Sequence, residues 1–276
     1  MEGTVCFIDL LGFSQLTANP DIINNQKIIC RYIKNLHKYI YQAIEKTNIK
    51  YCIISDSVFL YAEKEIDVLL FAMAKIFRNC LNSGVLLRAG MSYGEYNFIK
   101  SNIKTNNIYG IAVTKAVSLE KKGKGCRIFI DEDLPKESGL THLNPDIFLQ
   151  YKNHIDYSEI DIFEWPLFYK NYYVKPFDIV KNKKPIYELR ELLNNNCRIL
   201  SYLKHSPLFT WNIRSDEGKT HLSATIEYIT NITNMIIKNI NQFELLPIEY
   251  SLSKELRRGD AVNNLIEMYK NIFEVQ

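Results

Sequence analysis

Two aspartates in otherwise apolar stretches are the residues of this sequence best suited to chemistry. Asp9 interrupts FIDLLGFSQL (residues 7–16), and Asp56 lies between two serines in YCIISDSVFLYA (residues 51–62). Removing a carboxylate from water is costly unless something compensates its charge. If the two carboxylates met in space, they could hold two hard divalent cations that compensate both. Each aspartate could instead cap a turn, so two interpretations are open for either residue alone.

The elements around the aspartates decide whether they can meet. Apolar periodicity and turn residues predict an alternation of strands and helices. The predicted strands are 4–9, the two arms of a hairpin within 51–62, 85–95 and 126–131, and the predicted helices are 20–45, 66–81 and one that begins at about Gly110. This order is typical of an α+β protein of the ferredoxin-like kind, with helices over one face of a mostly antiparallel sheet. In such a sheet the first strand lies beside the strand that carries the hairpin, which would bring Asp9 and Asp56 together.

The final third of the chain has long helical patterns in place of the alternating strands and helices. Helical patterns with apolar residues at helical spacing are predicted over 186–204, 218–242 and 251–273. The aromatic-rich stretch 161–180 would complete the sheet or wrap around it. We therefore expect one domain over residues 1–184 and a helical C-terminal extension over residues 185–276.

Composition excludes several classes of protein. The 276 residues carry a formal net charge of only +3 and no long basic block, which disfavours a nucleic-acid-binding groove. The six cysteines are scattered without a C-x-x-C pair and the five histidines are dispersed, so we expect reduced thiols, a cytoplasmic location and no zinc site. No apolar stretch is long enough to cross a membrane, and because the candidate functional residues begin close to Met1 we expect no signal peptide.

Four segments carry a resemblance to a known family. FIDLLGFSQL, ISDSVFLY, LLRAGMSYGE and YGIAVTKAVSLE resemble, in order and spacing, the catalytic domain of class III nucleotidyl cyclases over residues 4–135. Within that class the chain looks most like the bacterial Pycsar anti-phage cyclases, which make cyclic CMP or cyclic UMP. The resemblance implies a ferredoxin-like cyclase domain and a metal-dependent enzyme, a phosphorus–oxygen lyase.

The resemblance also assigns roles to the first strand and the hairpin. Asp9, Asp56 and the backbone carbonyl of Leu10 would bind two Mg²⁺ or Mn²⁺ ions in each active site. The turn formed by Leu11, Gly12 and Phe13 would offer backbone N–H groups to the substrate's triphosphate. A plain tight turn is equally compatible with Gly12.

The positions that read the base differ from those of purine cyclases. Purine cyclases usually have a lysine four residues before the hairpin aspartate, where this chain has Cys52, and an acidic residue where it has Asn107. The amide of Asn107 can pair with uracil or cytosine, although turn chemistry would also explain an asparagine there. Tyr51 is a further candidate to stack on the base or hydrogen-bond with it, although strand alternation points it to the other face of the sheet.

Two helix positions also depart from the family pattern. Thr114 stands where many cyclases have an asparagine that orients the ribose, and Ser118 stands where they have an arginine that stabilises the transition state. The missing charge could come from basic residues nearby, namely Lys115, Lys121, Lys122 or Arg127. We expect Arg88, which lies inside a strand, to have a structural role.

Together these observations predict a cyclase that converts CTP or UTP into the 3′,5′-cyclic monophosphate and pyrophosphate. The resemblance implies a homodimer with composite active sites and a separate effector protein that senses the cyclic nucleotide in anti-phage defence, without nucleic-acid or membrane partners. Two alternatives are a purine (adenylate or guanylate) cyclase and an inactive module that keeps the fold for dimerisation or sensing.

Overall fold

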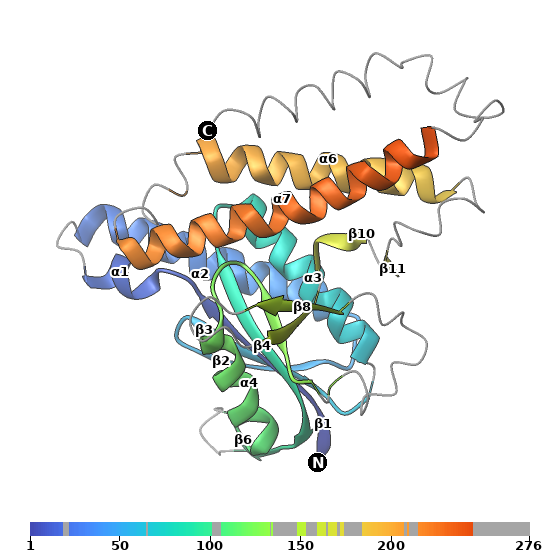
Figure 1. Cartoon of the computed structure of the whole chain (residues 1–276). Coiled ribbons are helices and arrows are strands. Elements are labelled where there is room, and N and C mark those ends of the chain that lie inside the picture. The colour runs from blue at the N-terminus through green and yellow to red at the C-terminus, as the bar shows by residue number, and fades with distance from the viewer. Residues whose placement is uncertain are drawn as a thin grey trace.

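In the computed structural model, strands and helices alternate along the first half of the chain as predicted (Figure 1). The structure describes residues 1–18, 22–64, 66–100, 106–132, 134, 148–152, 159–163, 165–169, 172–173, 184–206, 209 and 215–244. The predicted helix over 251–273 and the Pro20–Asp21 start of the first long helix lie outside these residues.

One seven-stranded sheet forms the centre of the molecule. Its strands are β1 (Glu2–Leu10), β2 (Lys50–Ile54), β3 (Ser57–Ala62), β4 (Leu87–Glu95), β7 (Ile128–Ile130), β8 (Phe148–Lys152) and β9 (Glu159–Phe163). Their order is β2-β3-β1-β4-β7-β9-β8, and β4–β7 is its one parallel pair among the described strands. With α2 (Ile22–Ile44) and α3 (Ile66–Asn82) as connections, the first four strands have the ferredoxin-like order. The predicted α+β fold class is confirmed.

Helices lie on both faces of the sheet, where the sequence led us to expect them on one. Ile8 and Leu10 of β1 are buried in a core that they share with α2 and α3. Val5, which points the other way, belongs to a second buried cluster with Ala112 and Ala116 of α4 (Ile111–Lys122). The alternation along β1 therefore serves two cores.

Gly90 of β4 allows α4 to approach the sheet closely. A Cβ atom at this position would lie 2.6 Å from the Glu120 backbone nitrogen and closer still to the Ala116 carbonyl oxygen. Side chains do not tolerate such distances, so this contact requires glycine. The approach places the C-terminal turn of α4 directly over the strand that carries Arg88.

The remaining elements lie around the sheet. They are α1 (Phe13–Ala18), β5 (Asn97–Lys100), β6 (Asn106–Tyr109), the 3₁₀ helix η3 (Trp165–Leu167), β10 (Phe168–Tyr169), β11 (Tyr172–Tyr173), α6 (Lys184–His205) and α7 (Asp216–Glu244). The patterns over 186–204 and 218–242 therefore predicted α6 and α7, whereas α1 and the β5–β6 hairpin lie where the sequence indicated a turn and a loop. None of the described helices is both long and apolar enough to cross a membrane.

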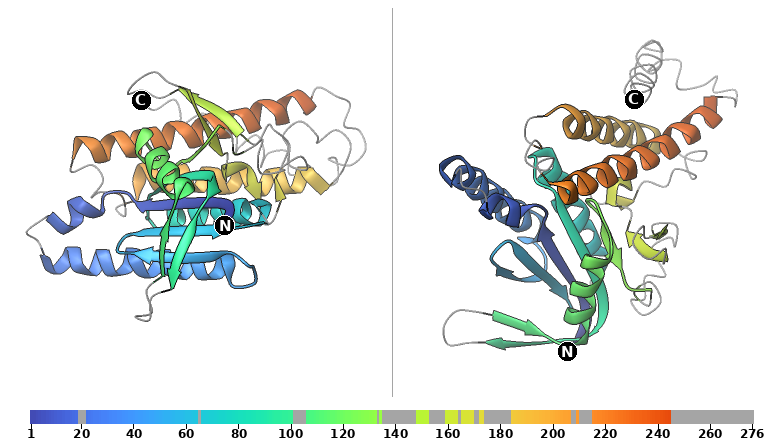
Figure 2. Two further views of the ribbon diagram at one scale, coloured as in Figure 1. Left: turned by 90° about the horizontal axis from the view of Figure 1, so that it is seen from below. Right: turned by 60° about the vertical axis from the view of Figure 1, so that its left-hand side comes forward.

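The helices α6 and α7 lie side by side beyond one end of the sheet, and the β5–β6 hairpin projects at the opposite end (Figures 1 and 2). Trp165 packs between α7 and α3, one of the helices that cover the sheet. It is fully buried, its indole N–H donates to the Cys126 carbonyl at 3.0 Å, and its ring contacts those of Phe77 and Tyr228. Since Phe77 belongs to α3 and Tyr228 to α7, the C-terminal helices share a core with the sheet's own helical layer.

Candidate active site

Asp9 lies near the end of β1, between two polar neighbours on adjacent strands. Its cross-strand partners are Ser57 of β3 and Arg88 of β4. The Ser57 hydroxyl donates a hydrogen bond to Oδ1 of Asp9 at 2.9 Å. Directly opposite residues on neighbouring strands share a face, so all three side chains project from the face that carries α4.

Asp56 reaches the same place from the hairpin turn. The turn between β2 and β3 consists of Ser55 and Asp56, and Ser55 adopts a left-handed backbone conformation with φ of 59°. That conformation is uncommon for residues other than glycine and is used in two-residue hairpins. The tight turn places Asp56 next to Ser57, the residue that hydrogen-bonds to Asp9. The predicted meeting of the two carboxylates follows from this register.

The groups around Asp9 compensate its charge only in part. Burial raises the pKa of its carboxyl above the usual range, and the nearby charge of Asp56 raises it further. The Ser57 hydrogen bond and the positive charge of Arg88 act in the opposite direction but do not cancel the effect of burial. A buried carboxylate whose ionisation is disfavoured, with a second carboxylate beside it, forms a site that a cation would stabilise.

Arg88 is held in place by α4. Its Nε donates to Glu120 Oε1, and its Nη1 donates to the Gly123 carbonyl at 3.0 Å. The side chain of Glu120 is only 3% exposed, so this is a buried ion pair. Burial raises the pKa of Glu120, and Arg88 lowers it. The expected structural role of Arg88 is confirmed.

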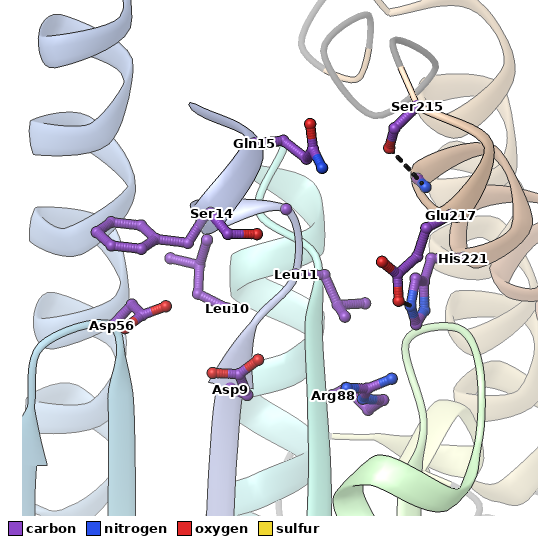
Figure 3. A pocket seen from close by; sticks show the side chains of 13 residues that line it. Asp9, Leu10, Leu11, Ser14, Gln15, Asp56, Arg88, Ser215, Glu217 and His221 are labelled. Carbon is purple, nitrogen blue, oxygen red and sulfur yellow. Dashed lines mark hydrogen bonds and ion pairs between the residues drawn. The ribbon is translucent and has the colours of Figure 1, made fainter. Parts of the chain in front are cut away.

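A single cavity of about 230 Å³ connects these residues (Figure 3). Residues that line it are Asp9, Leu10, Leu11, Gly12, Phe13, Ser14, Gln15, Asp56, Arg88, Ser215, Glu217, Gly218 and His221. It therefore contains every residue that the sequence assigned to the metal ions and to the triphosphate turn. Its volume is below the ~300–1,000 Å³ of pockets that enclose a whole small-molecule ligand, so the described part of one chain offers room for part of a nucleotide.

The turn after β1 has the conformation that glycine permits. Gly12 has φ of 82°, and its carbonyl accepts the hydrogen bond from the Leu16 N–H that starts α1. The Leu11 N–H donates to the Leu86 carbonyl at 3.0 Å and is therefore already used within the fold. Of the three predicted phosphate-turn residues, Gly12 and Phe13 remain the candidate backbone donors.

The predicted base- and ribose-reading residues do not line this cavity. Cys52 projects from the same face as Asp9, but it lies level with Phe7, two residues before Asp9 on β1, and is buried in the apolar cluster beneath α4. Tyr51 projects from the opposite face and is 46% exposed. Asn107 on β6 and Thr114 on α4 are exposed. One chain thus brings six of the predicted site residues together and leaves these four apart.

Two of the basic residues considered as substitutes for the missing arginine have other partners. Lys115 forms an ion pair with Asp131 at 2.8 Å. Arg127 is buried, donates from Nη2 to the Ala224 carbonyl at 3.2 Å and lies over the ring of Tyr228. Lys121 and Lys122 are exposed at the end of α4, as is Ser118 within it. None of these residues lines the cavity.

One wall of the cavity could not be predicted from sequence patterns. Ser215, Glu217, Gly218 and His221 come from the start of α7, in the region expected to be a separate helical extension. Glu120 was also missed, because it opens the basic stretch EKKGKG that looks like a solvated helix end. Helical periodicity identifies α7, but it does not say which surface its first turns contact.

The donor set at Asp9 and Asp56 fits a magnesium or manganese ion. Two carboxylates and a neighbouring backbone carbonyl are hard oxygen ligands, and Mg²⁺ is typically bound by one or two carboxylates plus water and substrate phosphates. The described residues contain no group of three or more His, Cys, Asp or Glu side chains that could hold a metal alone. The pair therefore suits an ion that takes its remaining ligands from the substrate and from water.

Comparison with known proteins finds likeness only among solved structures. No family model matches the chain, and no curated protein sequence matches it significantly. A bacterial light-regulated adenylyl cyclase is similar over 59% of this chain and 90% of its own, with 18% identity and a TM-score of 0.44. The adenylyl cyclase CyaB from P. aeruginosa (15% identity, TM-score 0.41) and the guanylate cyclase domain of RhGC from Catenaria anguillulae (11%, 0.42) are similar over 59% of this chain and 92% and 94% of their own.

Proposed function

We propose that this chain is a metal-dependent nucleotidyl cyclase that converts CTP or UTP into the 3′,5′-cyclic monophosphate and pyrophosphate. The observation that carries the proposal is the meeting of Asp9 and Asp56 in one cavity with the Gly12 turn. The same residues carry the sequence resemblance to class III cyclases, so geometry and motif point to the same chemistry.

In this proposal Asp9, Asp56 and the Leu10 carbonyl hold two Mg²⁺ or Mn²⁺ ions. Such ions would make the ribose 3′-hydroxyl more acidic and stabilise negative charge on the α-phosphate as pyrophosphate leaves. Ser57 orients Asp9 through its hydrogen bond, and Arg88 opposite Asp9 keeps positive charge at the same end of the sheet. The backbone N–H groups of Gly12 and Phe13 would bind phosphate oxygens.

The proposed preference for pyrimidines rests on two positions. Cys52 is buried among apolar side chains and supplies no charged donor of the kind that a lysine would present to a purine. Asn107 is exposed on β6, where its amide can offer a donor and an acceptor to a base. Tyr51 and Thr114 are the proposed contacts to base and ribose. All four would act on a nucleotide bound at the partner's Asp9 cavity.

A second copy of the chain is the proposed source of these four residues. Large apolar side chains are about half exposed on neighbouring elements: Ile54 of β2, Ile99 of β5, Tyr109 of β6 and Ile111 of α4, with Tyr51 of β2 on the opposite face of the sheet. An apolar surface of this kind favours burial against a partner. A two-fold symmetric pair would join it to the Asp9 side of the other chain and create two equivalent sites.

Incubation of the purified protein with each of the four nucleoside triphosphates and Mn²⁺ tests the proposal. We expect a cyclic monophosphate and pyrophosphate from CTP or UTP, and much less from ATP and GTP. Efficient production of cyclic AMP or cyclic GMP would replace the pyrimidine assignment with a purine one. The further proposal is that the product is a second messenger, read by a separate effector protein in anti-phage defence.

A further inference from the structure

The first turns of α7 are fastened to the loop that follows α4. Four consecutive residues of this loop bond to α7: Lys124 to Glu217 (3.2 Å), the Gly125 N–H to His221 Nδ1 (3.1 Å), the Cys126 N–H to Thr225 Oγ1 (2.9 Å) and Arg127 to the Ala224 carbonyl (3.2 Å). The same loop supplies the Gly123 carbonyl that binds Arg88. The wall of the cavity formed by α7 is therefore fixed relative to the sheet.

His221 presents one N–H group on this wall. It is 5% exposed and lines the cavity. Because Nδ1 accepts the hydrogen bond from Gly125, the proton of the neutral ring must be on Nε2. Nε2 lies 3.7 Å from Oε1 of Glu217, beyond the range of a good hydrogen bond.

Glu217 occupies the position of an anion on the same wall. Its Oε1 lies 3.2 Å from Lys124 Nζ and is also the atom nearest His221 Nε2. The Lys124 hydrogen bond lowers the pKa of Glu217, so its carboxylate is charged at neutral pH. The side chain is 68% exposed, so it can turn into solvent without losing buried contacts.

The side chains that line the cavity offer too little positive charge to balance a polyphosphate. Three of the lining side chains, Asp9, Asp56 and Glu217, are acidic, and Arg88 is the one lysine or arginine among the described lining residues. Arg88 is already bonded to Glu120 and to a backbone carbonyl. Two donors beside the α7 wall could add to Arg88, the proposed metal ions and the backbone N–H groups of Gly12 and Phe13. His221 lines the cavity, and Lys124, from the loop after α4, bonds to the lining residue Glu217.

We propose that Lys124 and the His221 Nε2–H bind the phosphate-bearing end of the nucleotide, and that Glu217 fills this anion position until substrate displaces it. The inference rests on the proposed function, and it gives α7 a role in binding the phosphates at the same site. A phosphate oxygen would accept the Lys124 bond that Glu217 now receives, together with the His221 Nε2–H, and the released carboxylate would face solvent.

Calorimetric titration of the full chain with inorganic tripolyphosphate tests this inference without relying on turnover. Glu217→Gln removes the competing charge and should tighten binding severalfold. Lys124→Met keeps the aliphatic side chain but removes the ammonium, and should weaken binding about tenfold, as expected for one charge-assisted hydrogen bond. Lys219→Ala, which breaks only the exposed pair of Lys219 with Asp216, is the matched control and should change nothing.

The direction of the Glu217→Gln effect separates binding from a structural role. If Lys124, Glu217 and His221 only held α7 to the loop, Glu217→Gln would lower the melting temperature and leave tripolyphosphate binding equal or weaker, and that result would overturn the inference. Unchanged binding in Lys124→Met would overturn it as well. The proposed function fails separately, if the wild-type protein cyclises no nucleoside triphosphate while tripolyphosphate binding still responds as expected.

Discussion

Asp9 and Arg88 lie directly opposite each other on β1 and β4, at the end of the sheet where the cavity opens. The guanidinium of Arg88 donates to Glu120 and to the Gly123 carbonyl. Its positive charge also lowers the pKa of both Asp9 and Glu120, so it is shared between these two carboxylates. This sharing explains why burial still raises the pKa of Asp9 despite a nearby arginine. It leaves the Asp9 carboxylate in an environment that favours a bound cation.

Removing Glu120 should destabilise the protein through Arg88. Glu120→Leu leaves a guanidinium that is mostly buried without its main partner, and loss of one member of a buried pair costs about 3–5 kcal/mol. Because Asp9 can take over part of the interaction, we expect a value near the lower limit, measured by urea unfolding. The double variant Arg88→Met/Glu120→Leu should recover most of the loss. Equal instability of the single and double variants would contradict this account of the pair.

The close approach of α4 to β4 predicts that Gly90→Ala is harmful. The added methyl group would meet backbone atoms of Ala116 and Glu120, which cannot move without displacing the helix. Overpacking of this kind costs about 1–3 kcal/mol or more, measurable as a lower urea midpoint. Ser118→Ala, at an exposed position of the same helix, is the control and should unfold as the wild type does. Wild-type stability in Gly90→Ala would mean that α4 lies farther from the sheet.

His221 should make stability depend on pH between about 4 and 6.5. Burial, together with the charges of Arg88 and Lys124, lowers its pKa to about 4, against the opposing effect of Glu217. The unfolded chain therefore binds a proton at His221 that the folded chain does not, and stability should rise with pH across this range by up to about 3 kcal/mol.

The matched variant for this measurement is His221→Asn, whose side-chain oxygen can still accept the Gly125 N–H. The carboxyls of Asp9 and Glu120 have raised pKa values and contribute the opposite slope, but they do so in both proteins. The difference between the two unfolding curves at pH 4.5 and pH 7 is therefore the readout. The same pH dependence in both proteins would show that His221 is not the group responsible.

The sequence predicted the parts of the site that depend on local patterns. Asp9 and Asp56 were found because each interrupts an apolar strand and because the ferredoxin-like order places their strands side by side. The α7 wall was not found, because Gly125 and His221 meet across 96 positions of the chain and only the packing of α7 decides that contact. Glu120 was missed for a related reason: its burial depends on an arginine on a neighbouring strand.

Mixed dimers test the proposed composite site. An Asp9→Asn subunit lacks a metal ligand, and a subunit with bulky substitutions at Asn107 and Thr114 lacks room for base and ribose. Each variant alone should be inactive, whereas a mixture should regain some activity, because one intact site forms in each mixed pair. No recovery after demonstrated subunit exchange, or full activity from a protein that sediments as a monomer, would contradict the composite site.

The most direct measurement compares turnover of CTP and UTP by the wild type, Asp9→Asn and Asp56→Asn in the presence of Mn²⁺. Each substitution removes one negative charge and almost no volume, so circular dichroism and melting temperature should confirm that both variants fold. Loss of one charge-stabilising group costs about 3–4 kcal/mol in the transition state, so the account predicts that cyclic nucleotide formation falls at least ~100-fold in either variant. Near-wild-type cyclase activity in either folded variant would contradict the assignment of the metal site to Asp9 and Asp56.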